Sequence, residues 1–324
     1  MVRASLLALA SLTWLTALRG EECPFRLGGA GLGWTAGLMY SQVDGGSSSS
    51  GSQERDASGL GSTSAPGSTS GTVFKGEITA SAWLASAAGS VQTPKGGGQG
   101  TTSPDRPRLD EIGLDGLRWL PLVDGGLTLF EDHELHVNYA ALDIGGRDAL
   151  KEDLLSQGQT FPAGAKVKSK LQLDLLRFGY RAPWLSLKIS EWSLTPEIGL
   201  SFDPFTYKLS SSSATGPVNR SYTIAFPYLG ISLAGPVAGP LRTELDVSGS
   251  AGINGATFAE ADLRLVYTFL QHGRLGAALV VGLRGTWLRR SDSQSPVPND
   301  VNLRLGSFSD DPWGGVNLGL RITF

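Results

Sequence analysis

The stretch that decides the fold is GGVNLGLRITF, residues Gly314 to Phe324, at the end of the sequence. Apolar side chains occupy every second position, at Val316, Leu318, Leu320, Ile322 and Phe324. The positions between them hold Asn317, Gly319, Arg321 and Thr323. Because successive side chains of a β-strand point to opposite faces, this period of two predicts a strand with one apolar and one polar face.

Four residues of this stretch also have a recognisable spacing, polar-x-Gly-x-x-hydrophobic-x-aromatic, at Asn317, Gly319, Ile322 and Phe324. The spacing resembles the assembly signal on the closing strand of Gram-negative outer-membrane β-barrel proteins. The resemblance covers residues 317–324 and implies that the barrel-assembly machinery is a transient partner. An edge strand of a soluble β-sandwich is the alternative, so the rest of the chain must decide between them.

Composition favours an all-β protein. The chain has 324 residues, a net charge of −3, 40% hydrophobic residues and 44 glycines, and helix-forming stretches are scarce. After residue 20 we find no apolar run long enough for a membrane-spanning helix. The chain also lacks the basic stripe that nucleic-acid binding requires, so we expect no nucleic-acid partner.

The first 20 residues resemble an export signal. Arg3 gives a positive start, residues 4–18 are apolar, and we place the cleavage near Gly20. Cys23 is the only cysteine, so no internal disulfide can form, and the acidic residues before it argue against a lipid anchor. Residues 21–72 form a lead-in that contains a Gly/Ser-rich segment, for which we expect disorder.

Residues 73–324 contain a series of alternating strands, of which 73–85 is the first clear one. The predicted hairpins pair 126–130 with 135–143, 166–180 with 185–208, 223–234 with 241–250, and 258–269 with 275–289. The intervening connections 144–165, 209–221 and 290–312 are long and polar. Short turns on one side and long loops on the other are typical of a transmembrane β-barrel.

We therefore predict an antiparallel up-and-down transmembrane β-barrel of about ten strands. The number of strands is left open between eight and twelve, because residues 25–42, 108–119 and 299–307 fit either strands or loops. The predicted hairpin HELHVNYAALDIGG (133–146) and TFPAGAKVKSKLQLDLLRFGY (160–180) resembles one that recurs in uncharacterised outer-membrane barrel proteins. That resemblance implies fold and location but no activity.

Several strands carry charges on the face opposite their leucines. In a small barrel this face points into the lumen, where charges of both signs must pair because leaving water costs several kcal/mol for each ion. The predicted luminal charges are Lys168, Lys170, Asp174, Arg242, Glu244, Asp246, Asp262 and Arg264. Their interspersed signs predict a lumen filled by side chains rather than a wide pore.

Catalysis is the weakest of the hypotheses. His133 and His272 lie in predicted turns, whereas His136 is on a predicted inward face beside Asn138. A Ser/His/acid set acting on lipids could be built from His136 with Asp174 or Glu191. However, the His-Ser pairing of lipid A deacylases is absent, and the sequence contains no motif for a nucleophile, metal or cofactor. We therefore expect no enzyme activity and no cofactor.

Together these patterns predict an outer-membrane barrel with a structural or interaction role, which holds long surface loops outside the cell. Its expected partners are outer-membrane lipid and lipopolysaccharide. Two alternatives remain, a narrow channel or transporter for small solutes and a lipid-modifying enzyme.

Overall fold

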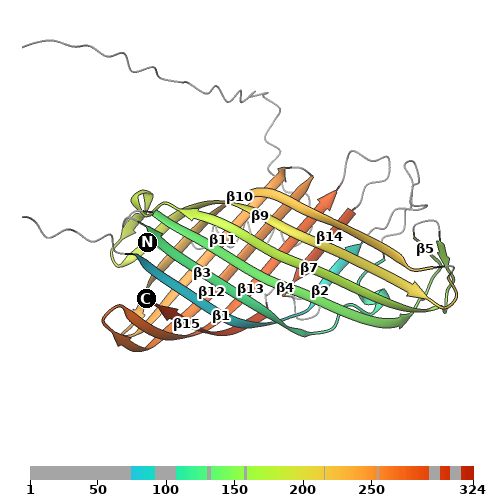
Figure 1. Ribbon diagram of the computed structural model, residues 1–324, viewed down its shortest axis with the longest axis horizontal. Coiled ribbons are helices and arrows are strands. Elements are labelled where there is room, and N and C mark those ends of the chain that lie inside the picture. Colours follow the sequence, from blue (N-terminus) through green and yellow to red (C-terminus); the bar gives the residue numbers. More distant parts are fainter. Residues whose placement is uncertain are drawn as a thin grey trace, which may run out of the picture. The chain divides into compact units, whose positions relative to one another are not determined.

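A computed structural model describes residues 74–91, 107–129, 133–156, 159–214, 216–253, 255–291, 300–306 and 315–324. The predicted signal peptide, Cys23 and the lead-in to residue 72 lie outside the described residues. Among the described residues, no helix is long and apolar enough to cross a membrane. The described chain is all-β, and its long tilted strands are shown in Figure 1.

Ten antiparallel strands form a closed barrel, which confirms the predicted fold class. Their order around the wall is β12-β11-β10-β9-β7-β4-β3-β1-β15-β13, and β13 pairs with β12 to close the circle. The barrel strands are β1 (Lys75–Ala85), β3 (Arg118–Leu129), β4 (His133–Ala149), β7 (Lys166–Arg181), β9 (Trp192–Ser211), β10 (Val218–Ala238), β11 (Leu241–Ile253), β12 (Ala256–His272), β13 (Leu275–Ser291) and β15 (Gly315–Thr323).

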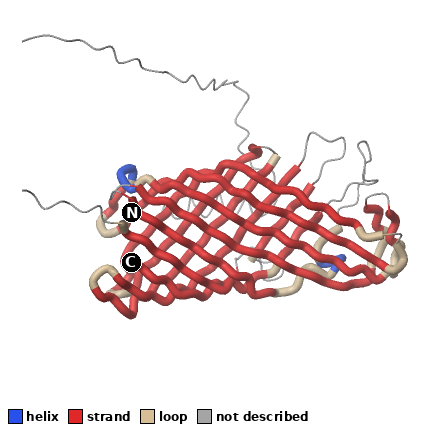
Figure 2. Tube along the Cα trace, viewed as in Figure 1, coloured by secondary structure: helices blue, strands red, loops and turns tan. Residues whose placement is uncertain are grey.

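Connections alternate between the two ends of the barrel. We call the end that holds Phe324 the turn end, and the opposite end the loop end. At the turn end, tight turns join β10 to β11 and β12 to β13, whereas η2 (Pro183–Leu185) and β8 (Leu187–Ile189) lie between β7 and β9. The connection between β7 and β9 is longer than predicted. The strand expected to start at Leu185 begins only at Trp192. Figure 2 shows how little of the described chain is helical.

At the loop end the connections carry structure of their own. They contain β2 (Ala87–Val91) and η1 (Asp110–Ile112), the hairpin of β5 (Leu154–Ser156) with β6 (Gln159–Phe161), and β14 (Asp300–Leu305). Strands β1, β3 and β15 stop short of this end. There β14 pairs with β13 and β2 pairs with β14, and these two short strands extend the wall where β15 and β1 have ended.

Within the stretch GGVNLGLRITF, Gly315–Thr323 form β15, which closes the barrel between β13 and β1. The strand register pairs Ile322 with Ile78 on β1, and Phe324 exchanges backbone hydrogen bonds with Gly76 at 2.8 and 2.9 Å. A Cβ on Gly76 would lie 2.6 Å from the Phe324 ring, so glycine there leaves the space that the ring occupies. The last residue is therefore fitted to the first strand.

Deleting Phe324 is expected to reduce the amount of barrel inserted into membranes more than it lowers the stability of barrels that have already formed. The reason is that the residue completes the seam that must pair last. Heat-modifiable migration of membrane extracts measures the assembled fraction, and Phe324→Tyr, which retains an aromatic ring, is the matched control. Unchanged insertion of the deletion variant would rule out a signal at this end.

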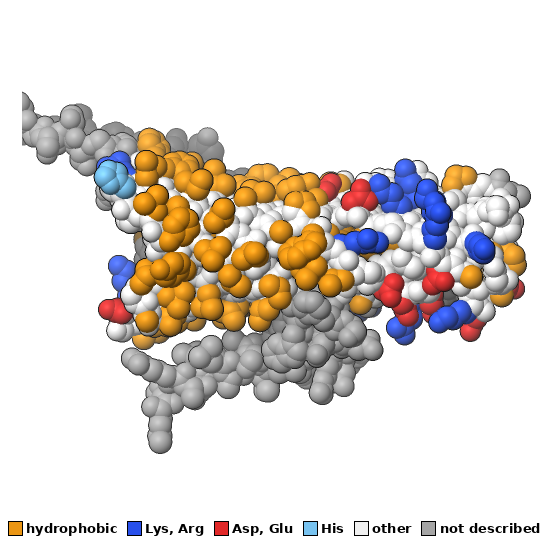
Figure 3. Space-filling view, turned by 90° about the horizontal axis from the view of Figure 1, so that it is seen from below, with side chains coloured by type: hydrophobic (Ala, Val, Ile, Leu, Met, Phe, Trp, Pro, Cys, Tyr) orange, Lys and Arg blue, Asp and Glu red, His pale blue; other side chains and the backbone are white. Residues whose placement is uncertain are grey.

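Outward-facing side chains toward the turn end form a continuous apolar band. The band includes Ile78, Val123, Leu127, Leu135, Val137, Tyr139, Phe178, Ile198, Leu200, Phe202, Leu229, Ile231, Leu263, Leu265, Tyr267, Leu279, Val281, Leu283, Leu318, Leu320 and Ile322, all exposed. Figure 3 shows this band as an orange surface that ends where charged side chains begin. An apolar belt of roughly 25 Å on the outside of a closed barrel is the surface that lipid covers.

Beyond the band, toward the loop end, the inner face of the strands is apolar and the outer face is polar. The interior there is an apolar core that includes Leu120, Leu142, Ile144, Leu171, Leu173, Leu175, Phe205, Phe226 and Phe258. Residues of the loop-end connections, Leu109, Ile112 and Leu114 among them, are buried in the same core. The outer surface of this part is polar, as expected for a β-barrel surrounded by water. The chain thus builds a water-facing barrel on top of a lipid-facing one.

The charged lumen as a candidate functional site

At the level of the apolar band, the barrel interior is a network of ion pairs. It is built by the inward positions of nearly every strand, where polar residues alternate with the outward apolar ones. Arg264 on β12 contacts four carboxylates within 4 Å. They are Asp124 at 3.9 Å, Glu244 at 3.7 Å, Asp262 at 4.0 Å, and Asp246, which pairs with the guanidinium directly. One buried arginine therefore links β3, β11 and β12.

Two arginines, on β7 and β13, meet at carboxylates of β12 in the centre of the network. Arg284 donates to Asn138 at 2.7 Å and pairs with Glu260 at 2.9 Å and Asp262 at 3.5 Å. Arg177 pairs with the other oxygen of Glu260, and its guanidinium lies 4.2 Å from the centre of the Phe258 ring. Because β7 and β12 are not neighbours in the wall, the Arg177–Glu260 pair crosses the lumen.

Two further arginines cross the lumen nearer the turn end. Arg321 of β15 makes a bidentate pair with Glu244 of β11, at 2.7 and 2.8 Å, and donates to Thr79 at 2.9 Å. Arg181 of β7 contacts Glu197 at 2.7 Å, Glu134 at 3.1 Å and Asp246 at 3.2 Å. Planar guanidinium groups suit such pairing because they bind carboxylates with two parallel hydrogen bonds.

His136 lies between two acidic side chains of this network. Its Nε2 is 3.6 Å from Asp124 and its Nδ1 is 3.6 Å from Glu197. Glu197 also accepts from the hydroxyl of Tyr228 at 2.7 Å. The Tyr228 ring lies over two paired glycines, Gly179 and Gly199, where a Cβ would approach Tyr228 atoms to 2.8 and 2.4 Å. With carboxylates on both ring nitrogens, His136 is placed as a member of the ion-pair network.

Little empty space remains among these groups. The cavity they line has a volume of about 30 Å³, about the volume of one water molecule. Above it, the apolar core of the loop-end half fills the barrel. Within the described residues, no group of three or more His, Cys, Asp or Glu side chains could hold a metal ion.

The eight predicted luminal charges fall into three groups. Glu244, Asp246, Asp262 and Arg264 point into the lumen and belong to the network. Arg242 lies at the turn end, where its side chain is 55% exposed and 3.7 Å from Glu244. Lys168, Lys170 and Asp174 instead lie on the outer surface, because Val167, Ser169, Leu171 and Leu173 take the inward positions of β7.

The prediction for Lys168, Lys170 and Asp174 was wrong for a physical reason. It assumed that the apolar face of each strand contacts lipid, which holds only within the band. The loop-end part of β7 stands outside the band, where the apolar face packs into the barrel core and the charged face meets water. Asp174 accepts a hydrogen bond from the outward-facing Tyr139 at 3.1 Å, and is therefore no partner for His136.

Much of the network lies outside the predicted set of charges, although inward parity marks its members. The missed residues are Asp124, Glu134, Arg177, Arg181, Glu197, Glu260, Arg284 and Arg321. Arg321 is on the polar face of β15, and Arg284 has the same inward parity on β13. Parity could have identified these residues, but it could not have shown which of them pair across the lumen.

Of the remaining predicted residues, Asn317 contacts the ion-pair network, through Asp262. Asn317 and Gly319 face the lumen from β15, and Asn317 donates to Asp262 at 3.2 Å, whereas Ile322 and Phe324 face outward. His133 and His272 lie at the turn end, and His133 shares a hydrogen bond of 2.6 Å with Tyr180. Glu191 lies in the turn before β9, at the same end.

The sequence matches no protein-family model and no curated protein. Among solved structures, the chain is similar to the outer-membrane protease OmpT from Escherichia coli, with a TM-score of 0.41 and 8% identity over 81% of this chain and 100% of that chain. It is also similar to Ail, the attachment invasion locus protein of Yersinia pestis, with a TM-score of 0.30 and 13% identity over 77% of this chain and 99% of that chain. Likeness at this level says nothing of ligand or activity, so the barrel rests on the strand pairing of this chain itself.

Proposed function

We propose that this chain is an outer-membrane barrel with a closed lumen, which serves a structural or interaction role through its loop-end half. In this proposal the turn end faces the periplasm and the loop end faces the outside, as short turns and long connections do in bacterial barrels. The signal-like amino terminus and the closing-strand spacing at Asn317, Gly319, Ile322 and Phe324 support export and insertion by the barrel-assembly machinery.

The observation that carries the proposal is the set of arginine–carboxylate pairs that cross the lumen. Arg177–Glu260, Arg181–Asp246 and Arg321–Glu244 each join strands that are not neighbours in the wall. Such pairs lie across the path that a solute would follow. The apolar core beyond them would oppose the passage of ions a second time, because it offers no polar group to replace water.

Catalysis finds less support in this arrangement. A general base needs one ring nitrogen free to take a proton from a nucleophile, whereas both nitrogens of His136 face carboxylates. The histidine also lies inside the barrel, while lipid acyl chains would contact the outer band. We therefore propose that the protein is not an enzyme.

Purified barrel in a planar lipid bilayer is expected to show no stable conductance steps, because the lumen is closed. The double variant Arg181→Ser with Arg264→Ser removes two cations that cross the lumen and is expected to produce openings. Arg274→Ser, in the exposed turn between β12 and β13, is the control and should remain silent. Stable openings of the unaltered protein that change in size with luminal charge would establish the narrow channel instead.

A further inference from the structure

Above the apolar band, cations gather on the outer wall formed by β4, β7 and β9. The strand register places Arg147 of β4 directly opposite Lys168 of β7, and Lys170 of β7 directly opposite Lys208 of β9. Like charges directly opposite each other in an antiparallel pair are destabilising, because their Cβ atoms are only about 5 Å apart. The two pairs lie side by side, because Lys168 and Lys170 are two residues apart on β7. Their mutual repulsion lowers the stability of the fold, so folding alone does not explain them.

These charges are poorly compensated by the protein. Lys170 pairs with Asp143 at 3.1 Å, and Asp148 accepts a hydrogen bond from the backbone of Ala149 at 2.7 Å. Within the described part of the chain, no carboxylate lies within ion-pair distance of Arg147, Lys168 or Lys208. Those three side chains are all exposed. The patch therefore has cationic groups available for an anion from outside.

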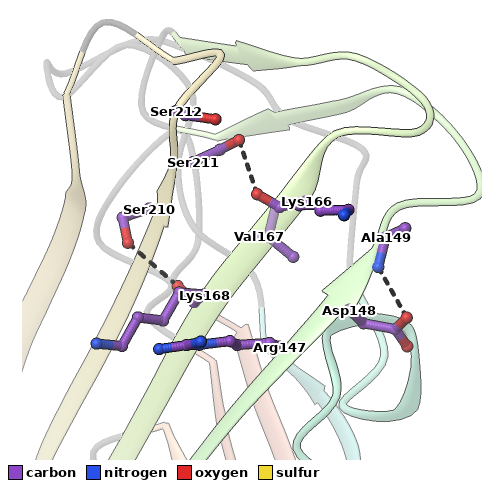
Figure 4. A pocket seen from close by; sticks show the side chains of 9 residues that line it. All are labelled: Arg147, Asp148, Ala149, Lys166, Val167, Lys168, Ser210, Ser211 and Ser212. Carbon is purple, nitrogen blue, oxygen red and sulfur yellow. Dashed lines mark hydrogen bonds between the residues drawn. The ribbon is translucent and has the colours of Figure 1, made fainter.

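The same surface is hollowed. An open groove of about 630 Å³ is lined by three cations, Arg147, Lys166 and Lys168, one carboxylate, Asp148, the serines 210–212, and the apolar Ala149 and Val167. Figure 4 shows Arg147 and Lys168 extending in the same direction across the strands, with Ser210 and Ser211 beside them. Ser210 and Ser211 donate to the backbone carbonyls of Lys168 and Lys166, at 3.4 and 2.9 Å. Cations beside hydroxyl groups are the chemistry that binds phosphorylated sugars.

The distance of the patch above the apolar band indicates which phosphates could reach it. Along β7, the last outward apolar residue is Leu176, and Lys170 and Lys166 lie about 20 and 33 Å further along the strand at 3.3 Å per residue. With a strand tilt of about 40°, the patch spans heights of roughly 15 to 25 Å above the band. The patch faces sideways, toward neighbouring lipids, and not toward the loop tips. At this height in an outer leaflet, the anionic groups are the phosphates on the sugars of lipopolysaccharide.

We infer that Arg147, Lys168, Lys170 and Lys208, with Lys166 and the serines of the groove, form a binding surface for the phosphorylated sugars of lipopolysaccharide. The inference rests on the outer-membrane location proposed above. It goes further in assigning a lipid ligand to named residues. The bound anion would offset the repulsion within the two like-charge pairs and would hold the water-facing half of the barrel against the leaflet.

The test titrates the mature barrel in non-ionic detergent with purified lipopolysaccharide. The triple variant Arg147→Gln, Lys168→Gln, Lys208→Gln is expected to bind about tenfold more weakly, because three charge-assisted contacts are lost. The matched control removes three exposed cations at the turn end, Lys75→Gln, Lys188→Gln and Arg274→Gln, and should bind as the unaltered barrel does. Heat-modifiable migration verifies that each variant is folded; should the triple variant fail to fold, Lys168→Glu alone replaces it.

Three further ligands identify the group that is recognised. Lipopolysaccharide stripped of its phosphates should bind the unaltered barrel and the triple variant equally weakly. Phosphatidylglycerol dissolved in the same detergent, which is anionic but lacks phosphorylated sugars, should not distinguish the two proteins. Equal affinity of the triple variant for intact lipopolysaccharide would overturn the inference, and a loss confined to heparin would assign the patch to a sulfated glycan instead. None of these substitutions is in the lumen. A negative result would therefore contradict the lipopolysaccharide site alone, and the closed lumen is tested separately by the conductance measurement.

Discussion

Replacing Arg284 with methionine is expected to destabilise the barrel by about 3–5 kcal/mol, because it leaves buried carboxylates without their cation. The Arg284 side chain is 1% exposed and pairs with both Glu260 and Asp262. It also donates to Asn138 of β4 and lies 5.4 Å from the ring centre of Trp83, so it joins opposite walls of the lumen. Methionine fills part of the volume but offers no charge.

The measurement is equilibrium unfolding by urea of the barrel in phospholipid vesicles. Arg274→Met, at the exposed turn between β12 and β13, is the matched control and should leave the free energy of unfolding unchanged. Adding Glu260→Gln to Arg284→Met should recover part of the loss, since it removes one of the unpaired carboxylates. A change below about 1 kcal/mol would mean that these charges are solvated and that the lumen is wet.

The second large effect separates the two halves of the barrel on one strand. Leu200 and Thr206 both face outward on β9, Leu200 within the apolar band and Thr206 beyond it. An arginine on the lipid-facing surface costs about 2–4 kcal/mol at the bilayer midplane and little near the interfaces. We therefore expect Leu200→Arg to lower the free energy of unfolding by that amount, and Thr206→Arg to change it by less than about 0.5 kcal/mol.

The comparison uses the same urea unfolding in vesicles, with Leu200→Ala to measure the loss of the leucine itself. Similar costs for Leu200→Arg and Thr206→Arg would show that the band does not end between these two residues. The height assigned to the cationic patch would then be wrong as well, because Lys208 follows Thr206 on the same strand.

The division of the barrel into a lipid-facing half and a water-facing half explains why the interior is filled in both. In the lipid-facing half, the outside must be apolar, so charged residues go inward, where cations and carboxylates pair across the lumen. In the water-facing half, the core is apolar, as in soluble β-proteins, and the loop-end elements β2, β14 and η1 pack into it. In the function proposed above, this half of the barrel presents its outer wall and loops to partners.

Inward parity and burial coincide where a single physical rule applies along the whole strand. Strands β11 and β12 lie largely within the apolar band, and their alternating charges, Glu244, Asp246, Asp262 and Arg264, are all luminal. Strand β7 runs through both environments, and the same rule failed for Lys168, Lys170 and Asp174. The period of two shows that the faces differ, but it does not show which solvent each face meets.

The sequence by itself determined that this protein is a barrel of antiparallel two-faced strands, because alternation in stretches such as GGVNLGLRITF is a local property of the chain. Only the tertiary structure decided where the lipid-facing half ends, since that height depends on strand tilt and on closure between β15 and β1. It alone also brought together pairs such as Arg177 and Glu260, which lie on strands that are not neighbours. Contacts across a lumen depend on the curvature of the whole sheet, and no local pattern encodes them.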